Sequence, residues 1–199
     1  MALLLAAAPV FAAEDIDIGP WRLGMSKEQV VAITDQGPYT DVAATGGLET
    51  KDGKFKGKKA NTSFVFAGGT LRSIEVRVYE GKAWDKAKDA ALDVFDQFVA
   101  NYGGASVKDV SPKVDRKELE KILDRTLGTA GEMNKQYAAR ARAMVVTYDM
   151  APLRQPADSR LHCQWIYLGK SDTYSVVVYQ DVPGAKSRDA EENIVIEKL

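Results

Sequence analysis

Hydrophobic residues recur at helical spacing in three segments of the chain, and residues that begin or end helices bound these segments. The first segment starts at Ser26, whose side chain can form a capping box with Gln29. It stops at Gly37, where we expect a left-handed conformation, followed by Pro38. The third starts at Asp115, a good N-cap residue. The pattern predicts helices over residues 26–36, 83–102 and 116–141.

Alternation of apolar and polar side chains marks the segments that we expect to be strands. The clearest is "NTSFVFAGGTLRSIEVRVYEG", two alternating runs on either side of Gly68 and Gly69. Before it, "LETKDGKFKGKK" carries an Asp52-Gly53 turn signal, so we expect an exposed edge hairpin or an ordered loop there. Residues 105–114 have the composition of a linker. Runs rich in β-branched and aromatic residues predict later strands over residues 143–150, 160–169 and 173–182.

Both halves of the chain supply helix and antiparallel strand, which predicts the α+β fold class. We expect an antiparallel sheet, or two such sheets, packed on one face by the helices. The order of elements predicts two α+β units, residues 14–104 and residues 105–199, the second being a helix followed by three strands. The sequence leaves open whether the two units share one sheet.

The first 13 residues are typical of a secretory signal peptide. An apolar run from Ala2 to Phe11 precedes the small residues Ala12 and Ala13, near which we expect cleavage. This predicts a periplasmic or secreted protein. The alternative is an ordinary apolar tail, because no Lys or Arg precedes the run. No later stretch is apolar over the roughly 20 residues that cross a bilayer, so we expect no transmembrane segment in the mature chain.

Charge is balanced over the whole chain and concentrated at one place. The 27 basic and 28 acidic residues give a net charge of −1, so we expect no nucleic-acid partner. The densest charged stretch holds five lysines with only one acid among them, and it is our candidate binding site for an anionic surface such as lipid head groups. These lysines are Lys51, Lys54, Lys56, Lys58 and Lys59. The alternative is that they protect an edge strand from aggregation.

The chain has a single histidine and a single cysteine, His162 and Cys163, and they are neighbours. Adjacent side chains of a strand point to opposite faces, so the two cannot act together as base and nucleophile. Cys163 shares its face with Leu161, Trp165 and Tyr167, which predicts a buried thiol, and His162 is expected at the surface or its boundary. No catalytic motif or close metal-ligand spacing occurs. We therefore expect no catalytic residues, no metal or other cofactor, and no enzyme.

The spacing of Gly24-Met25-Ser26, Val30 and Gly37-Pro38, followed by the hairpin from Phe64 to Ile74, resembles the BamE-like (SmpA/OmlA) family of envelope proteins. The resemblance covers about residues 16–80. It implies a small α+β fold, also seen in β-lactamase-inhibitor proteins, with short helices on one face of a three-stranded antiparallel sheet. It also implies a non-enzymatic, periplasm-facing accessory role in outer-membrane protein assembly or envelope integrity. The chain departs from the family's assembly proteins because it lacks a lipid-anchor cysteine after the apolar run.

Three functional hypotheses follow. The first is an exported, non-catalytic accessory of the envelope that acts through contacts with an envelope protein. The second is a soluble inhibitor or small-ligand-binding module that uses an uncovered sheet face, which aromatic residues such as Tyr79 and Tyr174 would then have to line. The third is a hydrolase with a carboxylate site, which requires a pocket where acids converge.

Overall fold

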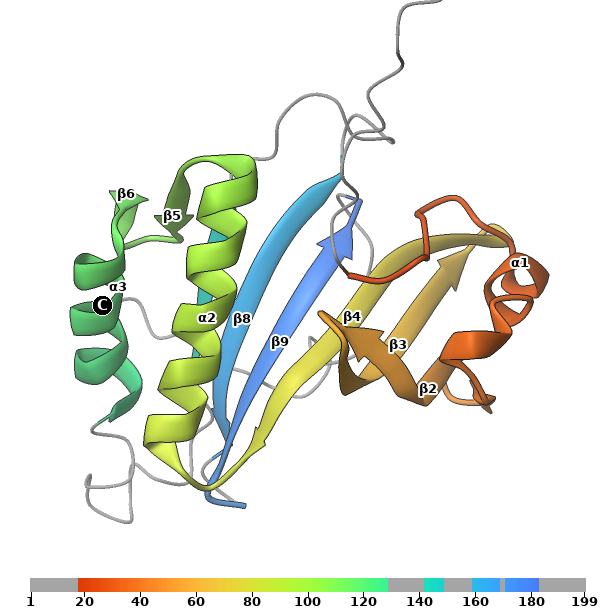
Figure 1. Ribbon diagram of the computed structural model, residues 1–199, viewed down its shortest axis with the longest axis horizontal. Coiled ribbons are helices and arrows are strands. Elements are labelled where there is room, and N and C mark those ends of the chain that lie inside the picture. Colours follow the sequence, from red (N-terminus) through yellow and green to blue (C-terminus); the bar gives the residue numbers. More distant parts are fainter. Residues whose placement is uncertain (1–17, 129–141, 149–158, 169–170, 183–199) are drawn as a thin grey trace, which may run out of the picture.

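The computed structural model describes residues 18–128, 142–148, 159–168 and 171–182. The strands within these residues form one nine-stranded sheet in the order β1-β2-β3-β4-β9-β8-β7-β5-β6 (Figure 1). All neighbouring strands are antiparallel, so the predicted α+β class with an antiparallel sheet is confirmed. The strands are β1 (Tyr39–Val42), β2 (Gly47–Phe55), β3 (Lys58–Ala67), β4 (Thr70–Gly81), β5 (Ala105–Val107), β6 (Ser111–Val114), β7 (Arg142–Tyr148), β8 (Arg160–Leu168) and β9 (Thr173–Asp181).

The helices begin where the sequence places their caps. The capping box of α1 is complete, because the Ser26 side chain accepts the Gln29 N–H and the Gln29 side chain accepts the Ser26 N–H. Asp115 caps α3 by accepting the Glu118 N–H at 2.8 Å. The helices are α1 (Lys27–Val31), α2 (Trp84–Tyr102) and α3 (Arg116–Leu123), with a 3-10 turn at Thr34–Gln36 and a π-helical turn at Asp124–Gly128.

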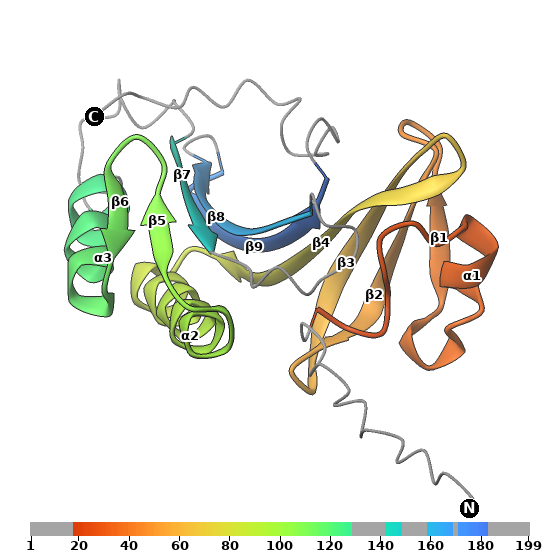
Figure 2. The same cartoon turned by 90° about the horizontal axis from the view of Figure 1, so that it is seen from above.

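Helix α2 crosses one face of the sheet, and the sheet is concave on the side away from it (Figure 2). The helix contacts β4, β9, β8 and β7, and α3 packs beside it. Its apolar side chains at helical spacing face inward, as predicted, except that Trp84 is only half-buried and Leu92 is buried in addition. The buried residues are Ala87, Ala91, Leu92, Val94, Phe95, Phe98 and Tyr102. Together with side chains from α1, α3 and the strands they form one hydrophobic core.

The pairing of β4 with β9 joins the two halves of the chain into one sheet. The two strands run from Ser73 opposite Asp181 to Gly81 opposite Tyr174, with one irregularity between Arg77 and Tyr79. Paired residues point to the same face, and a row of small apolar side chains therefore crosses four strands under α2. The row consists of Val76, Val178, Cys163 and Val146, each at most 1% exposed.

The Asp52-Gly53 turn that we expected is wrong, because both residues lie inside β2. The turn is at Lys56 and Gly57, which both have positive φ (53° and 72°), the geometry of a two-residue hairpin turn. Gly53 has a different role. A Cβ at this position would lie 2.5 Å from the Thr62 hydroxyl oxygen, so the close approach of β3 requires glycine.

Two further expectations are corrected. Residues 105–114 are not a linker but hold β5 and β6, because Ala105, Val107 and Val114 bury their side chains in the core. Gly37 is extended (φ −89°, ψ −176°) and not left-handed, since α1 already ends at Val31 and a separate 3-10 turn follows. The expected helix over 26–36 is thus two short pieces.

Several predictions fall outside the described residues: the signal peptide (1–13), the continuation of the third helix (129–141) and the end of the chain (183–199). Among the described helices, none is long and apolar enough to cross a membrane.

Candidate functional site

The five predicted lysines lie at the end of the β2–β3 hairpin, residues 51–59, which we call the lysine hairpin. Its turn is directed toward α2 in both ribbon views (Figures 1 and 2). Four of the lysines are exposed and Lys56 is half-buried. Lys54 and Lys59 are direct cross-strand partners, as are Phe55 and Lys58. The structure therefore gathers most of the positive charge of this stretch on one rigid two-stranded element.

Phe55 anchors the lysine hairpin to α2. Its side chain is 7% exposed, and its ring meets the Phe98 ring edge-on at 6.4 Å. The Lys56 ammonium lies 5.3 Å from the Phe55 ring centre and 5.0 Å from that of Phe98. At this range the ring faces attract the cation. Lys56 therefore links the hairpin turn to α2, and its positive charge lies at the junction where Phe55 of the hairpin meets Phe98 of the helix.

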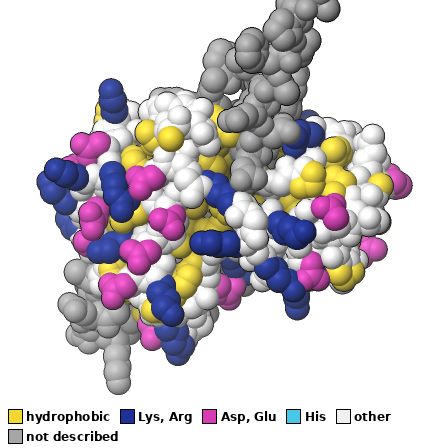
Figure 3. Space-filling model, in the orientation of Figure 1, with side chains coloured by type: hydrophobic (Ala, Val, Ile, Leu, Met, Phe, Trp, Pro, Cys, Tyr) yellow, Lys and Arg dark blue, Asp and Glu magenta, His cyan; other side chains and the backbone are white. Residues whose placement is uncertain are grey.

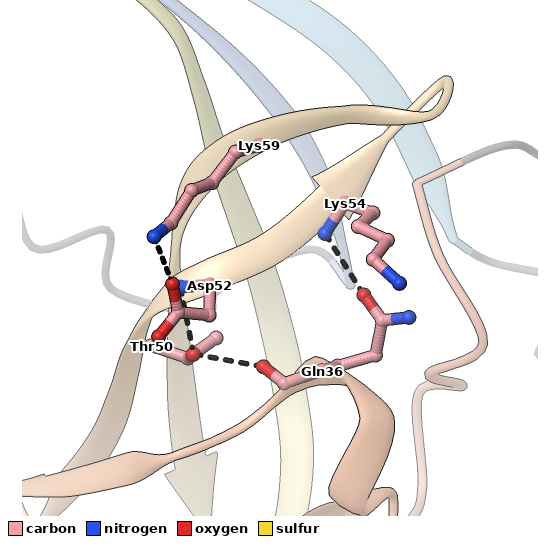
Figure 4. A network of polar contacts seen from close by, with 5 residues as sticks. All are labelled: Gln36, Thr50, Asp52, Lys54 and Lys59. Carbon is pink, nitrogen blue, oxygen red and sulfur yellow. Dashed lines mark hydrogen bonds and ion pairs between the residues drawn. The ribbon is translucent and has the colours of Figure 1, made fainter.

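Gln36 anchors the other side of the hairpin (Figure 4). Its side-chain oxygen accepts the Lys54 N–H at 2.8 Å, and its backbone carbonyl accepts the Thr50 hydroxyl at 2.8 Å. Strand β1 pairs with β2 only as far as Thr50, so Gln36 takes the place of a neighbouring strand beyond that point. Gln36 is 6% exposed, which makes these two bonds a buried support for the strand.

The charges of the lysine hairpin are only partly compensated. Lys59 forms an ion pair with Asp52, and its ammonium lies well apart from that of Lys54 (Figure 4). Lys51, Lys54 and Lys58 have no ion-pair partner in the described part of the chain. Like charges directly opposite in a sheet are destabilising, so the Lys54–Lys59 pairing carries a cost that Asp52 offsets in part.

Among the described residues, three hollows adjoin the hairpin. On the α2 side, Lys56 and Lys58 border a groove of about 210 Å³ between the hairpin and the helix. Figure 3 shows Lys and Arg side chains gathered over this junction, with hydrophobic surface visible between them. On the other side, Lys51 lines a cavity of about 430 Å³. Lys59 borders the groove and also the third hollow, which Lys51 lines as well. The structure thus distributes the predicted site over two faces.

The larger cavity is polar, and the residues of β4 that line it were not singled out by sequence reasoning. Glu49, Ser63 and Glu75 lie side by side on β2, β3 and β4, and Asn61 and Arg77 form the next row. Glu75 is only 5% exposed. The signal was present in the alternation of β4, where Glu75 and Arg77 are polar positions between apolar ones. Alternation within one strand does not reveal that β2 and β3 place Glu49, Ser63 and Asn61 beside them.

Tyr79 and Tyr174 do not line the uncovered face together. Tyr174 is buried on the α2 side, where its ring packs 5.2 Å from that of Trp84. Tyr79 donates its hydroxyl to the Ala83 carbonyl at 3.0 Å. The aromatic lining that a ligand-binding face would need is therefore not supplied by this pair.

His162 and Cys163 occupy opposite faces of β8, as predicted. Cys163 is fully buried in the core with Leu161 and Trp165, and burial raises the pKa of its thiol. His162 stacks on Tyr179, with ring centres 4.8 Å apart and planes at 7°. Burial, with a smaller contribution from Arg160, lowers the pKa of His162 to about 4. The imidazole is therefore neutral at pH 7.

Asp181 lies beside this ring but pairs with Arg160. Both carboxylate oxygens accept from the guanidinium at 3.1 Å. The 4.0 Å between His162 Nδ1 and Asp181 Oδ1 is too long for a hydrogen bond. Burial raises the pKa of Asp181, and the Arg160 charge opposes that rise. Among the described residues, no group of three or more His, Cys, Asp or Glu is placed to hold a metal ion.

No family model, no curated protein and no solved structure matches the chain. The resemblance to the BamE-like family accordingly stays a prediction from residues about 16–80.

Replacing Gln36 tests the support of the hairpin. We expect Gln36→Ala to lower the free energy of unfolding by about 1–3 kcal/mol, because the Lys54 N–H loses its acceptor. Urea denaturation measures the change. Thr34→Ala, an exposed position of the same turn, is the matched control and should change stability by less than about 0.5 kcal/mol. Equal stability of Gln36→Ala and the unchanged protein would contradict the role of Gln36.

The single histidine permits a direct test of its pKa. The lowered pKa means that the unfolded chain takes up a proton near pH 6.5, whereas the folded chain does so only near pH 4. Neutral His162 therefore stabilises the folded protein fully above pH 6.5. Up to about 3 kcal/mol of the free energy of unfolding is lost as pH falls to 4. NMR titration of the His162 ring should show no transition between pH 8 and pH 5.

The variant His162→Phe replaces the imidazole by an aromatic ring that can still stack on Tyr179 but cannot take up a proton. Its free energy of unfolding should fall less than that of the unchanged protein between pH 7 and pH 4.5. A native-state midpoint near pH 6.5 would show that the ring is solvated.

Proposed function

We propose that the protein is an exported, non-catalytic accessory of the cell envelope that acts by binding another envelope protein through the lysine hairpin. The observation that carries the proposal is that uncompensated lysines stand on a firmly anchored element. Phe55 and Gln36 fix the hairpin from its two sides, while Lys54 and Lys58 have no ion-pair partner among the described residues. An anionic partner surface would supply the missing compensation and would meet a site that needs no ordering.

Edge protection explains only part of this arrangement. Among the described residues, no strand lies beside β2 beyond Thr50 on the β1 side, so Lys54 fits the role of an edge lysine. Lys58 and Lys59, however, belong to β3, which lies between β2 and β4. A lysine in an interior strand does not shield an edge. The positive charge of the hairpin therefore exceeds what edge protection requires.

The non-catalytic part of the proposal is supported by what the two most reactive side chains do. Cys163 fills a core position, where burial raises the pKa of its thiol and so disfavours the reactive thiolate. His162 is stacked on Tyr179, with its pKa lowered well below neutral pH. Both residues thus have packing roles.

The second candidate is a small-ligand-binding module, and the polar cavity on the other face favours it. Its lining carries both acids and bases, including Glu49, Glu75, Lys51 and Arg77. A hydrolase with a carboxylate site is the third candidate, for which Glu49 and Glu75 are acids that line a common cavity. We rank the ligand-binding module below partner binding because Tyr79 and Tyr174, the aromatic residues named for such a face, do not line this cavity. We rank the hydrolase below both because the sequence carries no catalytic motif.

Charge reversal of the two uncompensated lysines tests the proposal. We expect Lys54→Glu combined with Lys58→Glu to lose a specific cross-linked envelope protein that the unchanged protein captures in intact cells. The matched control is Lys86→Glu with Lys121→Glu, the same charge change at exposed positions of α2 and α3. The measurement is quantitative mass spectrometry of cross-linked envelopes. Undiminished capture by the hairpin variant would contradict the proposal.

A further inference from the structure

We propose that the groove between the lysine hairpin and α2 binds an acidic segment of a partner protein and seats one large apolar side chain of that segment. This inference rests on the proposed function, partner binding through the hairpin, and adds the chemistry of the partner. The groove measures about 210 Å³ and is formed by β2, β3, β4 and α2.

The floor of the groove is apolar and continues the core to the surface. Phe55, Ala60 and Val94 belong to the buried core. Val78 and Ala90 pack against that core but are only half-buried, so their outer surfaces meet solvent. An apolar side chain placed here would remove water from both surfaces, the usual origin of a strong binding contact.

The rim of the groove is charged unevenly. Lys56, Lys58 and Lys59 stand on the hairpin side, and Asp93 and Gln97 on the α2 side. Lys59 shares its charge with Asp52, whereas Lys58 has no ion-pair partner among the described residues. A carboxylate that flanks the apolar side chain would therefore be attracted toward the hairpin side. The Gln97 amide is a hydrogen-bonding group that an extended backbone can use.

The placement of the lysines favours a protein segment over a lipid surface. Lys58 lines the groove on the α2 side, while Lys51 lines the cavity on the opposite side. A flat anionic membrane could contact only one of these faces, and on the α2 side it would also meet the exposed Asp93. A chain segment can follow the groove and place its acids next to the hairpin alone.

Selection from a random dodecapeptide library against the purified full-length protein tests the inference. We expect enriched peptides to carry one large apolar residue flanked by Asp or Glu. Ala90→Phe fills the groove and should weaken the binding of such a peptide by about tenfold or more. Ala100→Phe, at an exposed position of the same helix, is the matched control and should bind as the unchanged protein does.

The charged rim is tested with the same peptide. Lys58→Glu should weaken binding several-fold, Asp93→Asn should strengthen it, and Lys51→Glu on the opposite face should leave it unchanged. Thermal unfolding of each variant verifies the fold. Enriched peptides without acids, or full binding by Ala90→Phe, would overturn the inference. So would groove-dependent binding to phosphatidylglycerol vesicles, but not phosphatidylcholine vesicles, without any peptide binding.

The inference and the proposed function can fail separately. If the Lys54→Glu/Lys58→Glu variant loses its cross-linked partner in cells but Ala90→Phe keeps it, the hairpin binds a partner outside the groove and the inference is overturned. Loss of the same partner in both variants, with retention in Ala100→Phe, supports it.

Discussion

The antiparallel pairing of β4 with β9 is the contact on which the rest of the molecule depends. Strand β4 ends the hairpin region of the first half, and β9 is the last described strand of the second. Their pairing aligns Val76 with Val178, and through Cys163 and Val146 extends a continuous apolar row beneath α2. Fully burying a valine side chain contributes about 1.5–3 kcal/mol, so neither half would retain this part of its core alone.

The candidate site is a consequence of that arrangement. Helix α2 follows β4 directly and folds back over β9, β8 and β7, which brings its middle next to the end of the β2–β3 hairpin. The contact of Phe55 with Phe98 closes the junction, and the groove remains where the half-buried Val78 and Ala90 leave space. Lysines that are close in sequence thereby become the rim of a hollow whose floor comes from four separate elements.

Features set by neighbouring residues could be predicted from the sequence, and features set by distant ones could not. The caps at Ser26 and Asp115 and the stripe of α2 follow from spacing within a few residues, and the structure has them. The prediction of a turn at Asp52-Gly53 was wrong because the close approach of Thr62 on β3, and not a local turn, requires glycine at this position. The lysines of the site could be named in advance. The groove could not, because its walls meet only after β4 and α2 have folded together.

Native-state hydrogen exchange tests the central claim most directly. If the β4–β9 pairing makes one cooperative sheet, the slowest amides of β3 and β4 and those of β8 and β9 should exchange with the same free energy of opening. Added denaturant should lower both values in parallel. If the slowest amides of β3 and β4 instead open several kcal/mol more easily than those of β8 and β9, the halves are independent and the account is wrong.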